Sequence, residues 1–366
     1  MFGLAGMKTT VFSREGLFRR RADILLSPLI VSTRVSTQNY TQDPTTVSPQ
    51  RLHKLNFSKS GGIILHLHVP KTGGTTIRKS FQNRRRVTYL FSSNKAKYDE
   101  FADTMQNWVK YGPAPRRTKR KHTVINNGTT QINEPHIGIL EIHARNNPSF
   151  LSICEQVQYW KVTAQQNEIP FFAFTVLREP ESFGISYFNY YHGVAHEKRR
   201  FEYLPPDHLT NANFQRTMHN NPQCLFLARS EQAYQRNRPE LRATNLTHGE
   251  CQRSYSCLRG IMDWIGTTER LKNETIPLLT LLIDGHNTTT ISRSVDANTL
   301  IAPDTTTVNT NNIRHENQGP QLFGRYNMTK ESSEYLKAMT VWDQELYANV
   351  KRDYDFTLKF GHMLPS

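Results

Sequence analysis

Residues 61–81 read GGIILHLHVPKTGGTTIRKSF. The run from Gly62 to Val69 is apolar and rich in β-branched residues apart from two histidines, and it predicts a buried strand. A helical pattern begins at about Thr75, so a short loop with one lysine and two glycines connects the two elements. A strand, a tight loop and a helix in this order are typical of the first unit of a parallel α/β fold.

The composition of this loop is that of a phosphate-binding site. A loop between a parallel strand and a helix presents backbone N–H groups at the positive end of the helix. The glycines let the backbone approach an anion closely, the threonines add hydroxyl donors, and the lysine adds a full positive charge. We therefore predict a phosphate cradle rather than an ordinary glycine turn, formed by Pro70, Lys71, Thr72, Gly73, Gly74, Thr75 and Thr76.

The loop is not the Walker A motif of ATP-hydrolysing proteins. In that motif the lysine follows the glycines and precedes a hydroxyl residue that binds magnesium, whereas here Lys71 precedes the glycines. The segment LLIDG at 281–285 imitates a Walker B strand, but its partner motif is absent. The sequence therefore disfavours ATP hydrolysis.

Two further stretches predict strands of the same sheet. HIGILEIH covers residues 136–143, and PFFAFTVL covers residues 170–177 and is followed by a helix through ESFGISYFNYY. Strands that alternate with helices predict an α/β fold with a central parallel sheet covered on both faces.

The remaining pattern predicts loops and one long terminal helix. Two segments have the composition of long loops, 107–135 and 285–318, the second of which is rich in Asn and Thr. The residues 330–354 predict a single long helix near the end of the chain.

The order Pro-Lys-Thr-Gly-Gly-Thr-Thr resembles the 5′-phosphosulfate loop of sulfotransferases that use 3′-phosphoadenosine 5′-phosphosulfate (PAPS). It is most similar to the Golgi carbohydrate branch, which includes the heparan sulfate 2-O- and 6-O- and galactose 3-O-sulfotransferases. TVLREPESFGISYFNYY is similar to that family's 3′-phosphate site, in which a strand-end arginine precedes a helical serine by eight residues; Arg178 and Ser186 have this spacing. An arginine also suits a phosphate on chemical grounds, because it offers a planar fork of donors.

The resemblance spans roughly residues 61–355 and implies a P-loop NTPase-like three-layer fold, a PAPS donor and no metal. Looser matches are WIGTTERLKNETIPLL, DQELYANV and NTNNIRHENQ, the last of which resembles a late loop that closes over the nucleotide and makes Arg314 a candidate contact. One departure is Phe183, where the glycosaminoglycan branch often has an arginine. The class of acceptor therefore stays open.

The predicted chemistry is the transfer of a sulfuryl group to a carbohydrate hydroxyl. His143 ends a predicted strand, and a histidine ordinarily titrates near neutral pH, so we predict it as the general base, with Glu141 as the alternative. Lys71 is predicted to stabilise the charge that builds on the bridging oxygen as the S–O bond breaks. His68 is expected to face the cradle, and His66 is expected to lie in the core.

The composition predicts an anionic partner. The 366 residues carry a formal net charge of +15 and a pI of about 9.7. The basic runs NRRRVTY (83–89) and RRTKRKH (116–122) would suit an acidic glycan. No zinc knuckle, RNP motif or basic helix favours nucleic acid.

The compartment is inferred from cysteines and glycosylation motifs. The four cysteines include no CxxC pair, so a zinc cluster is not expected, and Cys251 and Cys257 are close enough in sequence to bridge in an oxidising compartment. Seven Asn-x-Ser/Thr motifs and the family resemblance favour the Golgi lumen. We expect residues 1–58 to be a disordered leader or stem and 59–366 to be the sulfotransferase domain. The apolar run ADILLSPLIV is shorter than the ~20 residues of a spanning helix, so a membrane anchor at or upstream of the N-terminus stays open.

Two other functions remain as alternatives. One is a nucleotide kinase or NTPase on the same P-loop architecture, and the other is a non-enzymatic basic protein that binds glycans.

Overall fold

The computed structural model describes Leu55 and residues 57–92, 95–113, 135–143, 149–190, 209–229, 246–285 and 326–355. The expected leader up to residue 54, the basic run 116–122 and the late loop with Arg314 lie outside these ranges. The expected domain boundary after residue 58 falls inside a short helix, α2 (Phe57–Ser60), whose Phe57 is fully buried in the core.

The core of the fold is a five-stranded sheet in the order β2-β3-β1-β4-β5, and every pairing in it is parallel. This confirms the predicted α/β fold with a central parallel sheet. The strands are β1 (Gly62–His68), β2 (Val87–Ser92), β3 (Ile137–His143), β4 (Phe171–Leu177) and β5 (Trp264–Thr267).

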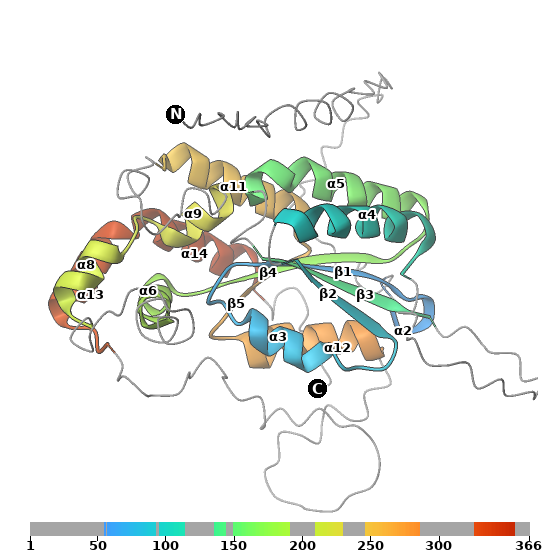
Figure 1. Cartoon of the computed structure of the whole chain (residues 1–366), viewed down its shortest axis with the longest axis horizontal. Coiled ribbons are helices and arrows are strands. Elements are labelled where there is room, and N and C mark those ends of the chain that lie inside the picture. The colour runs from blue at the N-terminus through green and yellow to red at the C-terminus, as the bar shows by residue number, and fades with distance from the viewer. Residues whose placement is uncertain are drawn as a thin grey trace, which may run out of the picture. The chain divides into compact units, whose positions relative to one another are not determined.

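Helices flank the sheet on both faces (Figure 1). One face carries α3 (Gly74–Phe81) and α12 (Ile276–Asp284), and the other carries α4 (Lys95–Tyr111), α5 (Phe150–Gln166) and α11 (His248–Ile261). The short π-helix η5 (Leu271–Thr275) leads into α12. The other described helices are α6 (Pro180–Phe188), α8 (Asn211–Thr217), α9 (Pro222–Ala228), α13 (Lys330–Met339) and α14 (Val341–Asp353).

The central strands form because their sequences suit burial on both faces. β1 and β4 are buried at every position, and β3 at all but its last residue. Strands of this kind are nearly continuous apolar runs, because helices cover both sides of a parallel sheet. The exceptions in β1 are His66 and His68, which share one face of the strand since side chains alternate along it.

Two sequence predictions about elements were wrong, and LLIDG, which could imitate a Walker B strand, is not a strand. The loop expected from residue 107 begins later, because α4 continues to Tyr111 and buries Trp108 and Val109. LLIDG is the end of helix α12 with Gly285 as its C-cap, not a Walker B strand. The single terminal helix is two helices that meet at Thr340, where the Asn221 side chain accepts hydrogen bonds from the Trp342 and Asp343 backbone N–H groups.

Two disulfides link the helices of one layer. Cys154 of α5 bonds to Cys257 of α11, and Cys224 of α9 bonds to Cys251 of α11. The bridge between Cys251 and Cys257, which the sequence left open, is therefore not formed. Both residues lie on α11, six positions and thus about 240° apart around the helix, so they point to different neighbours. The two disulfides are consistent with an oxidising, secretory-pathway compartment.

Within the ranges that the structure describes, no helix combines the length and the apolar character needed to cross a membrane.

Candidate active site at the carboxyl edge of the sheet

The carboxyl ends of the parallel strands bring the predicted residues to one edge of the sheet. His68 and His143 are register partners at the ends of β1 and β3, and Arg178 directly follows β4. The loop 69–73 connects β1 to α3 at this same edge. Ligands of open α/β sheets bind outside the carboxyl ends of the strands, so this edge is the candidate site.

The loop between β1 and α3 has a fixed backbone shape. Lys71 and Gly73 both have positive φ angles, 67° and 95°. The Thr72 hydroxyl donates to the Val69 carbonyl oxygen at 2.7 Å, and the first bond of α3 runs from Ile77 N–H to the Gly73 carbonyl at 3.1 Å. The opening N–H groups of a helix have no partner within it, so α3 presents its positive end beside this loop.

Position 74, the second glycine of the loop, has no room for a side chain because the His68 ring lies against it. A Cβ atom on Gly74 would lie 2.3–2.5 Å from three ring atoms of His68, much closer than real contacts allow. The imidazole therefore packs directly against the first residue of α3. This places His68 beneath the loop, as the sequence predicted.

Lys71 is partly buried at the site. Its Nζ atom lies 4.0 Å from the ring centroid of Tyr190, a cation–π contact with a residue just after α6. Burial lowers the pKa of Lys71 to about 8, and the nearby positive charge of Arg178 lowers it in the same direction. An anion bound at the site would offset both effects.

Arg178 has donor capacity that the described residues leave unused. Its Nη1 atom donates to the Lys71 carbonyl at 3.3 Å, but its Nε atom is buried and has no hydrogen-bond partner among the described residues. Burial lowers the pKa of the guanidinium, while Glu269 and Glu179 raise it. A buried cation with an unpaired donor beside a phosphate-type loop is an arrangement that suits an anionic ligand.

The two carboxylates nearest to Arg178 in sequence bond to other groups. Glu179 accepts hydrogen bonds from the Glu181 and Ser182 N–H groups at 3.0 and 2.7 Å and so caps α6. The Glu181 carboxylate accepts from the Ser333 hydroxyl at 3.1 Å and pairs with Lys337 at 3.2 Å.

The imidazole of His68 belongs to a buried polar network. Glu141 accepts hydrogen bonds from His68 Nδ1 and from the Tyr89 hydroxyl, each at 2.6 Å. Burial alone would raise the pKa of Glu141, but the charge and hydrogen bond of His68 outweigh it and lower that pKa to about 2. Glu141 is fully buried with both oxygens engaged, so it orients His68 and is poorly placed to contact a ligand.

His143 lies nearer the surface than Glu141. Its ring is edge-on to His68, with centroids 4.6 Å apart, and edge-on to Phe91 at 6.0 Å. His66 lies deeper, stacked on Phe174 at 4.5 Å and fully buried, and burial lowers its pKa to about 3. His66 is thus a neutral core residue, as predicted.

The remaining predicted residues that the structure describes lie around the same edge. Pro70, Thr72 and Thr76 are buried in the loop and in α3, and Thr75 is half-buried. Ser186 lies half-buried on α6, two turns after Arg178. Within the described part of the chain, no three His, Cys, Asp or Glu residues are grouped so as to hold a metal ion.

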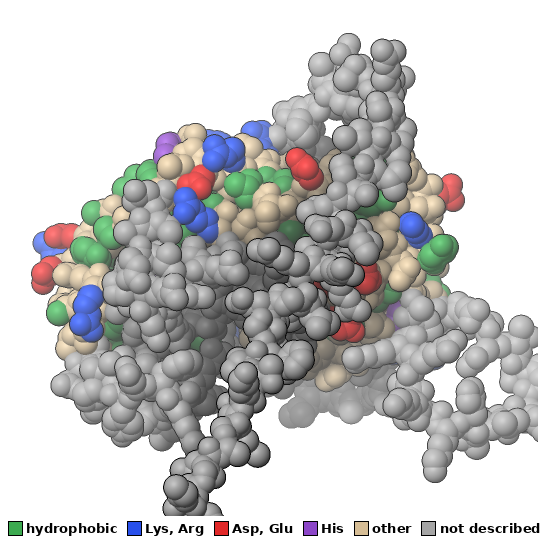
Figure 2. Space-filling view, turned by 45° about the horizontal axis from the view of Figure 1, so that its top comes forward, with side chains coloured by type: hydrophobic (Ala, Val, Ile, Leu, Met, Phe, Trp, Pro, Cys, Tyr) green, Lys and Arg blue, Asp and Glu red, His purple; other side chains and the backbone are tan. Residues whose placement is uncertain are grey.

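The first basic run lies at the opposite edge of the sheet, between the end of α3 and the start of β2. The Arg84 guanidinium bonds to Asp284 of α12 at 2.8 Å, and Arg86 donates to the Ser58 carbonyl at 3.2 Å. These two arginines therefore join elements of the fold. On the face shown in Figure 2, basic and acidic side chains of the described residues are interspersed rather than gathered by sign.

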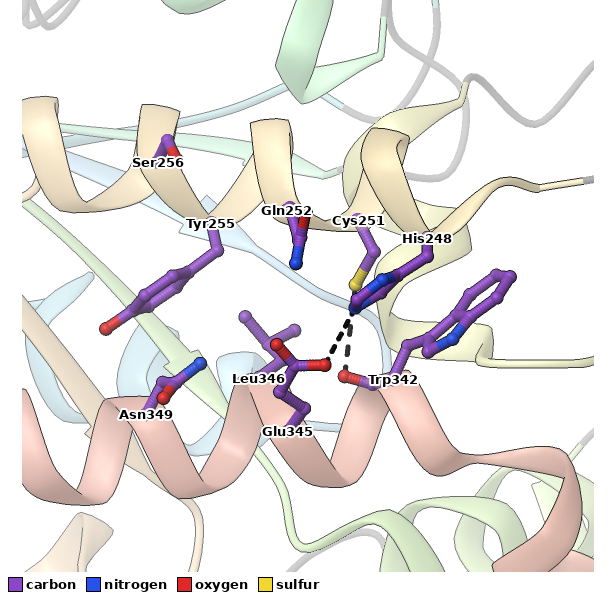
Figure 3. Close-up of a pocket in the computed structure, with 9 residues that line it drawn as sticks. All are labelled: His248, Cys251, Gln252, Tyr255, Ser256, Trp342, Glu345, Leu346 and Asn349. Carbon is purple, nitrogen blue, oxygen red and sulfur yellow. Dashed lines mark hydrogen bonds and ion pairs between the residues drawn. The ribbon is translucent and has the colours of Figure 1, made fainter.

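The structure also has a groove between α11 and α14, with a volume of about 290 Å³ (Figure 3). His248 Nε2 and Glu345 Oε2 lie 2.8 Å apart across it. The predicted site residues do not line this groove, whose walls are His248, Cys251, Gln252, Tyr255, Ser256, Trp342, Glu345, Leu346 and Asn349.

Sequence reasoning missed two contributors to the site. Gln223 of α9 bonds to the backbone of Arg178, and Glu269 accepts from Glu179 N–H at 3.1 Å and from the Tyr347 hydroxyl at 2.9 Å. Glu269 lay inside the matched segment WIGTTERLKNETIPLL, whereas nothing near Gln223 marked it.

No protein-family model matches this chain, and no curated protein is significantly similar to it.

Proposed function

We propose that this protein is a PAPS-dependent carbohydrate sulfotransferase with a P-loop NTPase-like fold. The observation that carries the proposal is the buried Nε of Arg178 beside the β1–α3 loop, which has no hydrogen-bond partner among the described residues. Together with Lys71 it supplies two cations next to the positive end of α3, a setting for a nucleotide with separated anionic groups.

In this proposal the loop 70–76 binds the 5′-phosphosulfate, and Arg178 and Ser186 bind the 3′-phosphate. His143 removes the proton of the acceptor hydroxyl, and the resulting oxygen attacks sulfur as the bond from sulfur to the phosphate oxygen breaks. The sulfuryl group ends on the sugar, and 3′-phosphoadenosine 5′-phosphate leaves with the negative charge. Lys71 stabilises that charge as it forms, so its contribution is largest in the transition state.

Two features count against a kinase or NTPase. Lys71 precedes the glycines, and the segment that could have formed a Walker B strand is the end of helix α12. A sugar hydroxyl as acceptor and the Golgi lumen as compartment follow from the family resemblance, and the two disulfides support the compartment. An acidic glycan would suit the net charge of the whole chain.

The donor is tested by thermal stabilisation. We expect 3′-phosphoadenosine 5′-phosphate to raise the melting temperature without magnesium, and ATP with magnesium to raise it less. The variant Arg178→Ala is the control and should lose most of the response to the first ligand. Stabilisation by ATP with magnesium alone would instead favour the kinase alternative.

The reaction is tested by incubating the protein with PAPS and a panel of neutral and acidic glycans. Mass spectrometry should find sulfated positions on at least one glycan, and Lys71→Ala should give none. If the protein binds the nucleotide but modifies no glycan, the carbohydrate acceptor is wrong. If the protein neither binds the nucleotide nor modifies a glycan, the sulfotransferase proposal fails.

A further inference from the structure

Gln223 holds the backbone of Arg178 through both atoms of its amide. Its Nε2 donates to the Arg178 carbonyl at 2.7 Å, and its Oε1 accepts from the Arg178 N–H at 2.9 Å. Gln223 is fully buried. The amide thus pairs with the Arg178 backbone as a neighbouring strand would. Arg178 needs such a partner because it lies one residue beyond the end of β4.

Gln223 is itself held on two sides. Its backbone N–H and that of Cys224 donate to the two carboxylate oxygens of Asp343, at 2.9 and 2.8 Å. In the opposite direction, the Asp343 N–H donates a hydrogen bond to Asn221 Oδ1 at 3.2 Å. The disulfide from Cys224 to Cys251 ties the same turn of α9 to α11. Gln223 therefore projects from a turn of backbone whose position is fixed before any ligand arrives.

The position of the Arg178 backbone decides where its guanidinium lies. The guanidinium has one direct bond among the described residues, from Nη1 to the Lys71 carbonyl at 3.3 Å, and its Nε is unpaired there. These contacts are too few to fix the side chain by themselves. The backbone anchor is therefore the firmer constraint on the arginine.

We propose that Gln223 is a positioning residue that aims Arg178 at the 3′-phosphate of the donor. This inference rests on the proposed function. It makes helices α9 and α14 part of the donor site, although neither is predicted to touch the nucleotide. A role limited to stability would lower the melting temperature without altering how the protein distinguishes one nucleotide from another.

The test measures that distinction by calorimetric titration. Wild type should bind adenosine 3′,5′-bisphosphate at least about tenfold more tightly than adenosine 5′-phosphate, the scale of one hydrogen bond to a charged group. Gln223→Met removes both amide bonds at similar volume. It should abolish most of this preference while changing the affinity for adenosine 5′-phosphate by less than about threefold. Adding Gln223→Met to Arg178→Ala should reduce the preference no further.

The control variant is Asn167→Leu. Asn167 also pins backbone with its amide, donating to the Val109 and Thr163 carbonyls at 3.1 and 2.8 Å, but at the far edge of the sheet. It should destabilise the protein and keep the preference. If Gln223→Met does not fold, Gln223→Glu is measured in the same way, because its carboxylate can accept from the Arg178 N–H but cannot donate to the carbonyl.

The outcomes separate the two proposals. A wild-type protein with no preference for the 3′-phosphate would overturn the proposed donor. A wild-type preference that survives in the Gln223 variants, or an equal loss for both nucleotides, would overturn the positioning role and leave the donor site standing.

Discussion

Lys71 lies where the loop, Arg178 and Tyr190 meet, and its charge is sensitive to pH. Burial, followed by the repulsion of Arg178, lowers its pKa to about 8. Because an anion favours the ammonium form, the affinity for 3′-phosphoadenosine 5′-phosphate should fall as the pH rises from 7 to 9. Lys71→Arg should show little of this fall, since a guanidinium stays protonated there. Titration calorimetry at three pH values would measure it, and an equally steep fall in Lys71→Arg would assign the effect to another group.

The turnover of Lys71→Ala tests its role in the transition state. We expect transfer to be abolished and the binding of the desulfated nucleotide to weaken much less. Retained turnover within a few-fold of wild type would contradict this role.

His143 is predicted to act on the acceptor. His143→Ala should lower the catalytic rate by about 10²–10⁴, the usual range for a positioned acid–base group, with donor binding nearly unchanged. The wild-type rate should fall at acid pH as an imidazole base becomes protonated, and the variant should lose this dependence.

Glu141→Gln is the control for that assignment. Because Glu141 bonds to both His68 and Tyr89, its replacement should cost stability and leave measurable turnover. If Glu141→Gln abolishes transfer while His143→Ala retains it, the carboxylate is the base.

Gly74 tests the packing beneath the loop. Gly74→Ala should destabilise the protein by about 1–3 kcal/mol, because the new methyl group would overlap the ring of His68 and Glu141 holds that ring in place. Chemical denaturation would measure the loss. The double variant Gly74→Ala/His68→Ala should lose less than the sum of the two single changes, and strict additivity would exclude the clash as the cause.

At the scale of elements, α9 and α14 cap one another. Asp343 accepts from the first turn of α9, and Asn221 accepts from the first turn of α14. Burial raises the pKa of Asp343 to about 7, against the lowering effect of the two backbone N–H groups. The native state therefore binds more protons than the unfolded state between about pH 4 and pH 7, and this group's contribution to stability falls as the pH rises through that window.

The expected result concerns the pH dependence of unfolding. The stability advantage of wild type over Asp343→Asn should be larger at pH 5 than at pH 8 by about 1 kcal/mol or more, the equivalent of one pKa unit. Denaturation at both pH values would measure the difference. An advantage that grows with pH would mean that Asp343 is ionised in the folded protein at pH 5.

The length and burial of each element decided whether it could be predicted from the sequence. β1, β3 and β4 were predictable because they are buried apolar runs, and the loop at 70–76 because strand, glycines and helix are contiguous. β5 has only four residues and β2 is an edge strand with half-buried positions, so neither gave a clear pattern. The break at Thr340 depends on Asn221, more than a hundred residues away, and the bonds from Gln223 to Arg178 join residues 45 positions apart. No local pattern contains such contacts.

At the scale of the whole molecule, the two disulfides differ in the length of chain they enclose. The bridge Cys154–Cys257 spans 103 residues and Cys224–Cys251 spans 27. A loop of about 100 residues is worth about 4.7 kcal/mol in the chain-entropy estimate, and a shorter loop is worth less. Replacing the first pair with serine should therefore cost more stability than replacing the second. Peptide mapping without reduction should recover these two pairings, and a Cys251–Cys257 peptide would contradict the structure.

The order of the strands also determines when the sheet can form during synthesis of the chain. β1 is the central strand and, of the five described strands, the first to be synthesised. Its residue Ile63 pairs with Phe171 of β4, which comes 108 residues later. At about 5–20 residues per second, synthesis of that interval takes roughly 5–20 s. Throughout this period the apolar segment Ile63–Leu65 lacks at least one of its two neighbouring strands. The nascent chain must therefore be kept from aggregating for several seconds, until β4 is available to pair with β1.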